Sequence, residues 1–225
     1  MPDDIQIITT GDGSHSLLNT ALNETYHSVH GAKRESIHVF IKQGLEYFLE
    51  RKAVDTVKIF EVGFGTGLNA LLTANFAQQH HQKISYTSIE AFPLDETIWK
   101  KLNYTESSED TVLFQRLHTA TWQAENLIND FFSLTKLETT LQEVSPDQNV
   151  FDVVYFDAFA PSKQPELWEI EMLQKVFGAL KPNGVFVTYC AKGQLKRDLK
   201  TIGFLVETLA GPPGKKEMVR ALKNS

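Results

Sequence analysis

The chain has 225 residues, of which 42% are hydrophobic and 22% are charged, and its formal net charge is −6. No apolar run approaches the roughly 20 residues of a membrane helix, and the acidic start Met1-Pro2-Asp3-Asp4 lacks the apolar segment of a secretory signal. The one cysteine, Cys190, excludes an internal disulfide framework and a cysteine-built zinc site. These features predict a cytoplasmic protein in a reducing compartment, with no contact with a membrane.

The charge is unevenly distributed along the chain. Residues 1–180 carry 13 Lys/Arg and 25 Asp/Glu, whereas residues 181–225 carry 9 Lys/Arg and 3 Asp/Glu. A basic C-terminal fifth on an acidic body favours a local patch for an anionic partner. A solvated charged surface explains the same numbers.

Strands and helices alternate along the predicted chain. The turn signal Thr10-Gly11-Asp12-Gly13-Ser14 indicates a small hairpin within residues 5–30. In chain order, the next predicted elements are a helix over 35–52, a strand over 57–62, a helix from the glycine cluster through Phe76, a strand over 84–90, helices over 94–103 and 123–142, a strand over 150–157, a helix over 166–180, a strand over 185–190, a helix over 193–202, a strand over 204–207 and a short strand over 218–221.

This alternation predicts an α/β fold with a doubly wound sheet. The last two strands leave no room for a helix between them, so they should pair as an antiparallel hairpin. We expect a seven-stranded, mostly parallel sheet with an antiparallel last strand. Residues 1–52 should form an N-terminal extension that packs on a core of residues 53–225, in one compact domain.

A glycine cluster lies between the first predicted strand and its helix. It reads Glu61-Val62-Gly63-Phe64-Gly65-Thr66-Gly67, in the strand–loop–helix context of a nucleotide-binding loop. Its G-x-G-x-G spacing differs from that of dinucleotide-binding loops. An acid two positions before the first glycine is typical of S-adenosylmethionine enzymes, where it serves the amino-acid end of the cofactor. A purely structural glycine turn is the alternative.

Two further strand ends carry acids. Glu90 ends the second strand, where a carboxylate can accept hydrogen bonds from ribose hydroxyls, and Phe92 beside it offers an apolar wall for adenine. Asp157 ends the third strong strand and begins Asp157-Ala158-Phe159-Ala160-Pro161. In enzymes that methylate amines, an acid or amide with a proline often holds the nucleophilic nitrogen here. Trp168 either lines this pocket or is a core aromatic residue.

The histidines do not form a recognisable metal motif. His27 and His30 are three residues apart, and His80 and His81 are adjacent, but neither pair has a cysteine or an obvious carboxylate to complete a ligand set. We therefore predict no metal site. A G-x-S-x-G elbow and a Walker A loop are also absent from the sequence.

Nearly the whole chain resembles the tRNA 5-methylaminomethyl-2-thiouridine methyltransferases, the MnmC-like methyltransferase domain in its stand-alone, MnmD form. The glycine loop alone is unspecific, since many methyltransferases have one, but the other strings are specific in combination. The resemblance rests on Asp12-Gly13-Ser14, Glu24-Thr25-Tyr26-His27-Ser28, Gly31-Ala32, Glu35-Ser36-Ile37-His38-Val39-Phe40, Glu61 to Asn69, Asp157-Ala158-Phe159-Ala160-Pro161, Pro165-Glu166-Leu167-Trp168, Thr188 to Gly193 and Gly211 to Met218.

The resemblance implies a class I, Rossmann-like fold and methyl transfer from S-adenosylmethionine to the amine of 5-aminomethyl(-2-thio)uridine at the tRNA wobble position. The cofactor would contact Glu61, Gly63, Phe64, Gly65, Gly67, Asn69, Glu90, Phe92 and Asp157, with 119–122 near the base. The substrate pocket would include Tyr26, Gly31, Ala32, Glu35, Phe159, Pro161 and Trp168, although a capped helix start at Ser36 also explains the residues around Glu35. The tRNA backbone in the anticodon region would contact Lys192, Lys196, Arg197, Lys200, Lys215 and Lys216.

In some relatives this domain is fused to an FAD-dependent oxidase that makes the amine. The chain has neither the length nor a second dinucleotide motif for that oxidase, so we expect separate enzymes to supply the amine. A free primary amine has a pKa near ~10 and is mostly protonated at neutral pH. Asp157 is therefore the predicted catalytic residue, mainly as positioner of the nitrogen and also as proton acceptor.

Two other classes of function stay open from the residues alone. A spermidine-synthase-like aminopropyl transferase, or another small-molecule transferase, shares the glycine loop and an aspartate near this strand, but would need further acids for a polyamine. A non-catalytic nucleotide-binding module shares the glycine loop. Methyl transfer to tRNA with and without the aminomethyl group distinguishes the three.

Overall fold

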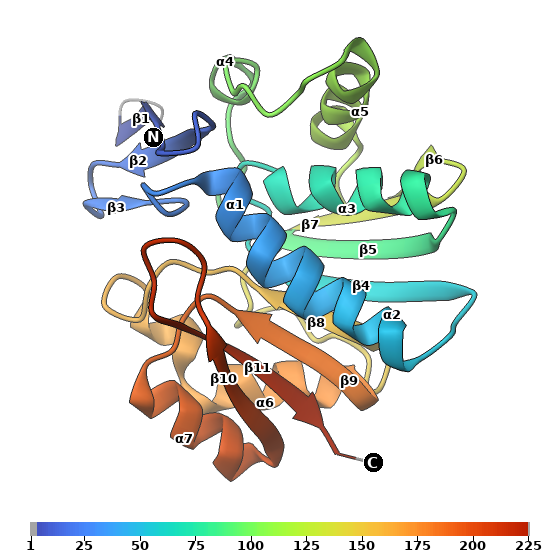
Figure 1. Cartoon of the computed structure of the whole chain (residues 1–225), viewed down its shortest axis with the longest axis vertical. Coiled ribbons are helices and arrows are strands. Elements are labelled where there is room, and N and C mark those ends of the chain that lie inside the picture. Colours follow the sequence, from blue (N-terminus) through green and yellow to red (C-terminus); the bar gives the residue numbers. More distant parts are fainter. Residues whose placement is uncertain (1–3, 225) are drawn as a thin grey trace.

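The computed structural model describes residues 4–224 and contains an eight-stranded sheet with helices on both faces (Figure 1). Across the sheet the strand order is β10-β11-β9-β8-β4-β5-β7-β6. The central strands are parallel, β6 is antiparallel to β7, and β11 is antiparallel to both of its neighbours. The strands are β4 (Thr56–Val62), β5 (Lys83–Glu90), β6 (Glu125–Asn129), β7 (Phe132–Glu138), β8 (Phe151–Phe156), β9 (Leu180–Thr188), β10 (Phe204–Ala210) and β11 (Glu217–Lys223).

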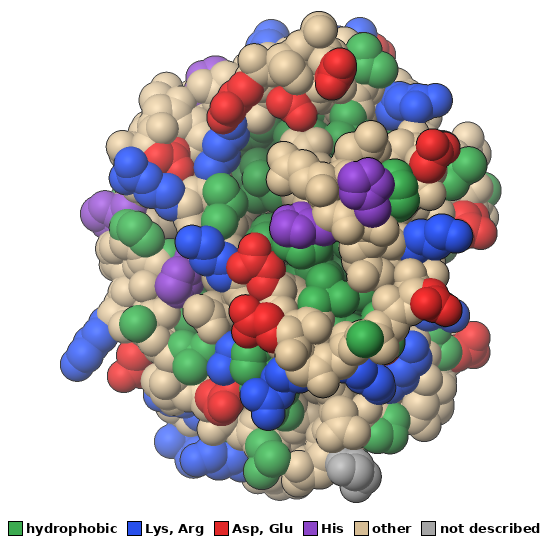
Figure 2. Space-filling model, turned by 45° about the vertical axis from the view of Figure 1, so that its right-hand side comes forward, with side chains coloured by type: hydrophobic (Ala, Val, Ile, Leu, Met, Phe, Trp, Pro, Cys, Tyr) green, Lys and Arg blue, Asp and Glu red, His purple; other side chains and the backbone are tan. Residues whose placement is uncertain are grey.

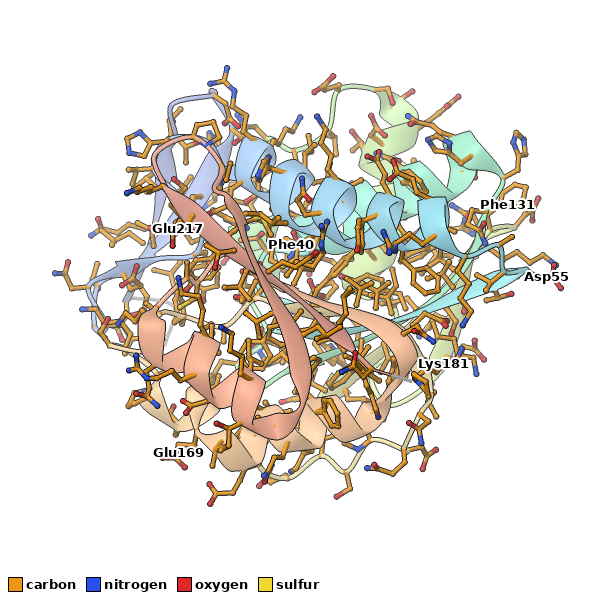
Figure 3. The ribbon with its side chains drawn as sticks, turned by 60° about the horizontal axis from the view of Figure 1, so that its bottom comes forward. Phe40, Asp55, Phe131, Glu169, Lys181 and Glu217 are labelled. Atoms are coloured by element: carbon orange, nitrogen blue, oxygen red, sulfur yellow. The ribbon has the colours of Figure 1, made fainter. Side chains whose placement is uncertain are left out.

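Helices cover the two faces of this sheet. On one face lie η2 and α3, which are blue and turquoise in Figure 3, and on the other face lie α6 and α7, which are orange. The helical elements are α1 (Ala32–Ser36), the π-helix η2 (Ile37–Glu46), α2 (Tyr47–Arg51), α3 (Leu68–His80), α4 (Glu96–Trp99), α5 (Ser108–Thr119), the 3₁₀ helix η3 (Pro165–Trp168), α6 (Ile170–Ala179) and α7 (Gly193–Ile202).

The apolar sequence of the central strands reflects burial on both faces. In β8, Val153 and Tyr155 join the hydrophobic cluster under η2 and α3, whereas Val154 and Phe156 join the cluster under α6 and α7. Successive side chains of a strand point to opposite faces, and a strand covered on both faces is therefore apolar throughout. These strands form the rigid base from which the loops of the site project.

The helix that crosses the sheet comes very close to it at one glycine. A Cβ on Gly44 would lie 3.0 Å from Val187 Cγ2 and 3.2 Å from the Tyr155 ring. Figure 3 shows Phe40, one turn earlier, between η2 and the sheet, where it packs on Tyr155 at a ring-centroid distance of 5.2 Å. This packing fixes the start of the helix, and with it Glu35, relative to the sheet.

A small antiparallel sheet precedes that helix. It consists of β1 (Ile5–Thr9), β2 (His15–Asn19) and β3 (Glu24–Thr25), in that order. Asp12 joins it to the helix, because Oδ2 accepts from the Arg34 backbone N–H at 3.0 Å and Oδ1 accepts from the Ser14 backbone N–H. Burial raises the pKa of Asp12, but hydrogen bonds from the Ser14 hydroxyl, from the backbone N–H groups of Arg34 and Ser14, and from the Thr10 hydroxyl outweigh burial and hold it at about 2. The predicted N-terminal extension starts at residue 1, and the prediction of no secretory signal also rests on the first residues. Of these, residues 1–3 lie outside the described residues.

The structure confirms the α/β fold with a mostly parallel sheet, but it corrects several elements. The helix predicted over 123–142 is wrong, because this segment forms the β6–β7 hairpin, and the sheet has eight strands rather than seven. The helix over 94–103 is reduced to α4, whereas α5 was not predicted. The strand predicted over 185–190 begins earlier and ends at Thr188, and the final hairpin is antiparallel as expected. No helix among residues 4–224 has the length and apolar character to cross a membrane.

Candidate active site

A cleft of about 1080 Å³ opens at the carboxyl ends of β4, β5 and β8. The chain leaves β4 toward β5 on one side, while β8 pairs with β4 on the other. This is the topological switch point at which open α/β sheets bind ligands. The N-terminal segment and the β10–β11 connection form its outer walls, and both lie at the same side of the molecule in Figure 1.

The glycine loop forms the floor of the cleft. Gly63, Gly65 and Gly67 have φ values of 95°, 50° and 73°, a region that residues with a Cβ rarely adopt. A Cβ on Gly63 would lie 2.6 Å from the Asp157 carbonyl oxygen. The backbone N–H of Gly63 donates to the Ile89 carbonyl at 3.0 Å, so the loop is fixed between the ends of β5 and β8.

Glu61, Asn69 and Asp157 form a chain of polar side chains on this floor. Asn69 Nδ2 donates to Glu61 Oε1 at 3.1 Å and to Asp157 Oδ2 at 2.8 Å, and Ser88 Oγ donates to Glu61 Oε2 at 2.6 Å. Glu61 is fully buried, whereas Asn69 and Asp157 line the cleft. Asn69 Oδ1 is buried without a hydrogen-bond partner among the described residues.

Burial dominates the ionisation of both carboxyl groups. It raises the pKa of Glu61 from 4.5 to about 8, with a further contribution from the charge of Asp157. It raises the pKa of Asp157 from 3.8 to about 7, and the charge of Glu35 adds to this effect, whereas Asn69 and Lys215 oppose it. A carboxyl group that titrates near neutrality suits acid–base chemistry at the pH of the cell.

Glu90 faces the glycine loop from the end of β5. Its Oε2 accepts from the Gly65 backbone N–H at 2.9 Å, and its Oε1 accepts from the Phe92 backbone N–H at 2.9 Å. Burial raises its pKa, although these backbone donors oppose the rise. Phe92 is 77% exposed at the edge of the cleft, so its ring is free to cover a planar ligand.

Aromatic and charged side chains close the outer side. The Tyr26 ring meets the Phe159 ring edge-on at 4.9 Å. Glu35 is 4% exposed, and its Oε2 accepts from the Ser28 backbone N–H at 2.6 Å. Lys215, from the β10–β11 connection, reaches Glu35 Oε1 with its Nζ at 2.5 Å.

A second layer of polar groups supports the glycine loop from below. His118 Nε2 lies 3.1 Å from the Thr66 carbonyl oxygen, and burial lowers the pKa of His118 to about 3, so the neutral ring donates this bond. Lys136 is fully buried and donates to the His118 carbonyl at 2.6 Å, with its Nζ 4.5 Å from the Trp122 ring centre. Burial also lowers the pKa of Lys136, to about 8.

The structure brings most, but not all, of the predicted site residues to the cleft. Those that line it are Tyr26, Glu35, Gly63, Phe64, Gly65, Asn69, Glu90, Phe92, Asp157, Phe159 and Lys215. Glu61 and Gly67 lie behind this surface, and Gly31 and Ala32 lie at the start of α1 outside the lining. Residues 119–122 do not line the cleft either.

Trp168 and Pro161 do not line the cleft, contrary to our prediction of a shared pocket. Both line a separate cavity of about 70 Å³ beside α7. Trp168 is 7% exposed, its Nε1 donates to the Phe159 carbonyl at 2.8 Å, and its ring packs on Phe156. The core alternative for Trp168 therefore describes its position, from which it supports the loop that carries Phe159.

The residue patterns did not predict residues 139–143 or Tyr189 as part of the site. Residues 139–143, which follow β7, line the side beyond Glu90, together with the predicted apolar wall around Phe92. Their position follows from β7, which was predicted as part of a helix, so the signal was hidden with the strand. Tyr189, directly after β9, also lines the cleft, and its hydroxyl donates to the Ala158 carbonyl at 2.8 Å.

The basic C-terminal residues lie in different environments. Lys192, Arg197, Lys200 and Lys216 are exposed, whereas Lys196 pairs with Glu217 at 3.1 Å. On the face drawn in Figure 2, basic and acidic side chains are interspersed rather than separated by sign. Among residues 4–224, no group of three His, Cys, Asp or Glu side chains is arranged to hold a metal ion.

Comparison with known proteins places these features in a family. A model described as "S-adenosyl-L-methionine-dependent methyltransferase" matches residues 103–224. Two relatives named tRNA 5-methylaminomethyl-2-thiouridine biosynthesis bifunctional protein MnmC are similar, from Nitrosospira multiformis (26% identity, 91% of this chain, 35% of the relative) and Pseudoalteromonas atlantica (30% identity, 90% and 31%). The chain therefore spans about a third of the length of these curated relatives.

Solved structures give the same assignment of fold. The crystal structure of MNMC2 from Aquifex aeolicus is similar over 98% of this chain and 71% of that one, with 27% identity and a TM-score of 0.79. The CMeT domain of the citrinin polyketide synthase covers 80% of this chain and 50% of its own, with 13% identity and a TM-score of 0.51. This second likeness concerns the fold alone.

Proposed function

Because the chain belongs to the family of S-adenosyl-L-methionine-dependent methyltransferases, we propose that it methylates the primary amine of 5-aminomethyl(-2-thio)uridine at the wobble position of tRNA. The names of its relatives support this choice of substrate. The observation that carries the proposal is Asp157, a carboxyl group with a pKa of about 7 that faces the cleft beside Asn69.

The residues of the cleft fit S-adenosylmethionine. Asn69 Oδ1 is a buried acceptor without a partner among the described residues, and the Glu61 carboxyl group lies directly behind Asn69. The ammonium group at the methionine end of the cofactor needs hydrogen-bond acceptors and a negative charge of this kind. We assign the methionine end of the cofactor to Glu61, Gly63, Phe64, Gly65, Gly67, Asn69 and Asp157, and the ribose to Glu90. Phe92 and residues 139–143 stand on the side left for the base.

Asp157 would orient the amine and take its proton. When bound, the cofactor supplies an electrophilic methyl group, to which the nitrogen forms a bond while the bond from carbon to sulfur breaks. The amine arrives mostly protonated, since its pKa in water is near ~10, and the apolar wall of Tyr26 and Phe159 disfavours the charged form. One proton per transfer goes to the Asp157 carboxylate, which then releases it to water.

A tRNA substrate also requires contacts outside the cleft. We assign the phosphates of the anticodon region to basic residues of two segments, the α7 segment with Lys192, Lys196, Arg197 and Lys200, and the β10–β11 connection with Lys216. Such a substrate places the reaction in the cytoplasm, and we assign the supply of its aminomethyl group to a separate enzyme activity. Tyr26, Gly31, Ala32 and Glu35 belong to the N-terminal extension that would close over the nucleoside.

Single-turnover methylation of tRNA tests the proposal. Asp157→Ala should slow transfer to aminomethyl-bearing tRNA by roughly 10²–10⁴-fold, the usual contribution of a positioning or acid–base group. Asp157→Asn should lose less if orientation is the main role, and as much as alanine if proton acceptance is. Cofactor affinity, measured alongside, should fall far less than the rate of methyl transfer.

The substrate controls identify the class of enzyme. Unmodified tRNA should accept no methyl group at the wobble position, and free polyamines should accept none. Transfer to polyamines without transfer to tRNA would favour a small-molecule transferase. A wild-type rate in Asp157→Ala would mean that another residue holds the nitrogen.

A further inference from the structure

Lys215 occupies an unusual place for a residue expected to meet phosphate. Its Nζ lies 2.5 Å from Glu35 Oε1 and 3.6 Å from the centre of the Tyr189 ring. Both Glu35 and Tyr189 line the cleft. A carboxylate together with the face of an aromatic ring is a common recognition site for an ammonium group.

This ammonium site is held in shape by contacts that do not involve Lys215. Glu35 Oε2 accepts from the Ser28 backbone N–H at 2.6 Å, and the Tyr189 hydroxyl donates to the Ala158 carbonyl at 2.8 Å. The Glu35 side chain is 6% exposed, whereas that of Lys215 is 31% exposed. A lysine ammonium is carried on a flexible four-carbon stem, so it can leave while the carboxylate and the ring remain.

The site is adjacent to the reacting carboxyl group. The charges of Glu35 and Lys215 both act on the pKa of Asp157, the first raising it and the second lowering it. The charge of Asp157 in turn raises the pKa of Tyr189, after the larger effect of burial. The Tyr189 hydroxyl donates to the carbonyl of Ala158, the residue that directly follows Asp157, so a cation bound between Glu35 and Tyr189 lies near the proposed proton acceptor.

We propose that Glu35 and Tyr189 form the binding site for the primary ammonium group of the substrate, and that Lys215 fills this site until the substrate displaces it. The inference rests on the proposed function for the identity of the amine. An exchange of one ammonium for another leaves the buried Glu35 carboxylate paired throughout, which avoids the cost of an unpaired buried charge. A hydroxymethyl group, which has no charge, does not replace Lys215 in this way.

The alternative role for Lys215, contact with tRNA phosphate, predicts the opposite effect of its removal. If Lys215 competes with the substrate, Lys215→Met should tighten amine binding. The gain should be about tenfold if the lysine occupies the site about 90% of the time, because the apparent affinity is reduced by the fraction of competent sites. If Lys215 binds phosphate, Lys215→Met should raise the KM for tRNA and leave the binding of a nucleoside unchanged.

A nucleoside without phosphate separates these outcomes. We would titrate 5-aminomethyluridine, and 5-hydroxymethyluridine as its uncharged counterpart, into the protein saturated with S-adenosylhomocysteine, and measure both affinities by calorimetry. Lys42 is exposed on η2, away from the cleft, so Lys42→Met is the matched control for the loss of one positive charge. We expect Lys215→Met to bind 5-aminomethyluridine more tightly than the wild type does. Its affinity for 5-hydroxymethyluridine, and both affinities of Lys42→Met, should be unchanged.

Glu35→Gln provides a second, independent variant. It retains an acceptor for the Ser28 N–H but removes the negative charge, so the two nucleosides should then bind with similar affinity. Thermal unfolding of each variant shows whether the fold is intact. Unchanged or weaker amine binding in a folded Lys215→Met protein would overturn the inference, as would a preserved preference for the amine in Glu35→Gln.

The outcome is distinguishable from failure of the proposed function. Wild-type protein that methylates aminomethyl-bearing tRNA, with no gain of amine affinity in Lys215→Met, refutes the ammonium exchange and leaves the reaction intact. Amine binding that tightens as expected, without any methyl transfer to tRNA, supports the ammonium site and refutes tRNA as the substrate.

Discussion

Glu61→Gln should stabilise the ligand-free protein at neutral pH and weaken its binding of S-adenosylmethionine. Glu61 is fully buried at the end of β4, and burial raises its pKa from 4.5 to about 8. Between these two values the folded state holds a proton that the unfolded state has lost. The free energy of unfolding therefore falls as the pH rises through this window. The contribution of Glu61 to stability is most favourable below pH 4.5.

The size of the effect follows from the two pKa values. The slope is at most about 1.4 kcal/mol per pH unit, so Glu61 should lower the free energy of unfolding by about 2–3 kcal/mol between pH 5 and pH 7. Glutamine does not titrate and should lack this decline. Asp157 titrates in part of the same window, but it does so in both proteins, so the difference between them isolates Glu61.

Urea unfolding at pH 5, 6, 7 and 8 measures the difference directly. The curves of unfolding free energy against pH should diverge, with the variant gaining on the wild type as the pH rises. Calorimetry on the same samples should show weaker cofactor binding by the variant. The wild type at pH 7 should also release a proton on binding, because the ammonium group of the cofactor stabilises the ionised form of Glu61. Parallel pH curves for the two proteins would refute the assignment of a protonated, buried Glu61.

Three other changes test neighbouring parts of the site. Glu90→Ala should weaken S-adenosylmethionine binding by on the order of 2–4 kcal/mol, because two charge-assisted hydrogen bonds to the ribose are lost; unchanged affinity in calorimetry would remove Glu90 from the ribose site. Gly63→Ala places a Cβ 2.6 Å from the Asp157 carbonyl at a φ of 95° and should destabilise the protein by about 1–3 kcal/mol in urea unfolding, whereas wild-type stability would show that the loop adjusts freely. Replacing both Lys200 and Lys216 by glutamine should weaken tRNA binding and lower the slope of its salt dependence by about 1 to 2, with cofactor affinity unchanged; an unaltered slope would place the phosphate contacts elsewhere.

The sequence predicted the parts of the fold in which hydrophobic pattern and turn residues agree. The central strands are apolar throughout because both of their faces are covered, and the glycine loop is recognisable from its acid, its spacing and its flanking elements. The prediction of a helix over residues 123–142 was wrong because the strand pattern of β7 is hard to recognise there. Its buried face consists of Phe132, Leu134 and Lys136. A lysine in that series hides the alternation of a strand, and its burial depends on the His118 carbonyl and the Trp122 ring, which no local pattern reveals.

Contacts between distant segments were equally hidden. The sequence marks Glu35 and Lys215 as charged residues, but nothing local indicates that 180 positions apart they form an ion pair. From the charge distribution along the chain, Lys215 was predicted to belong to a basic surface. In the structure, the β10–β11 connection directs Lys215 toward the cleft. Trp168 is the opposite case. It follows the predicted site closely in sequence, but its ring does not line the cleft.

The short strand β6 also affects how copies of the protein behave when crowded together. Without it, β7 would present its seven residues as an open, pairing-competent edge to any neighbouring chain. β6 covers that edge with only five residues, and its register shifts between Leu127 and Asn129. The Asn126 side chain bends back to the Ala124 carbonyl, with its Nδ2 at 2.8 Å. A strand this short and irregular is a poor template for a further strand, so β6 disfavours pairing with another chain at this edge of the sheet, even though Leu127 is 74% exposed.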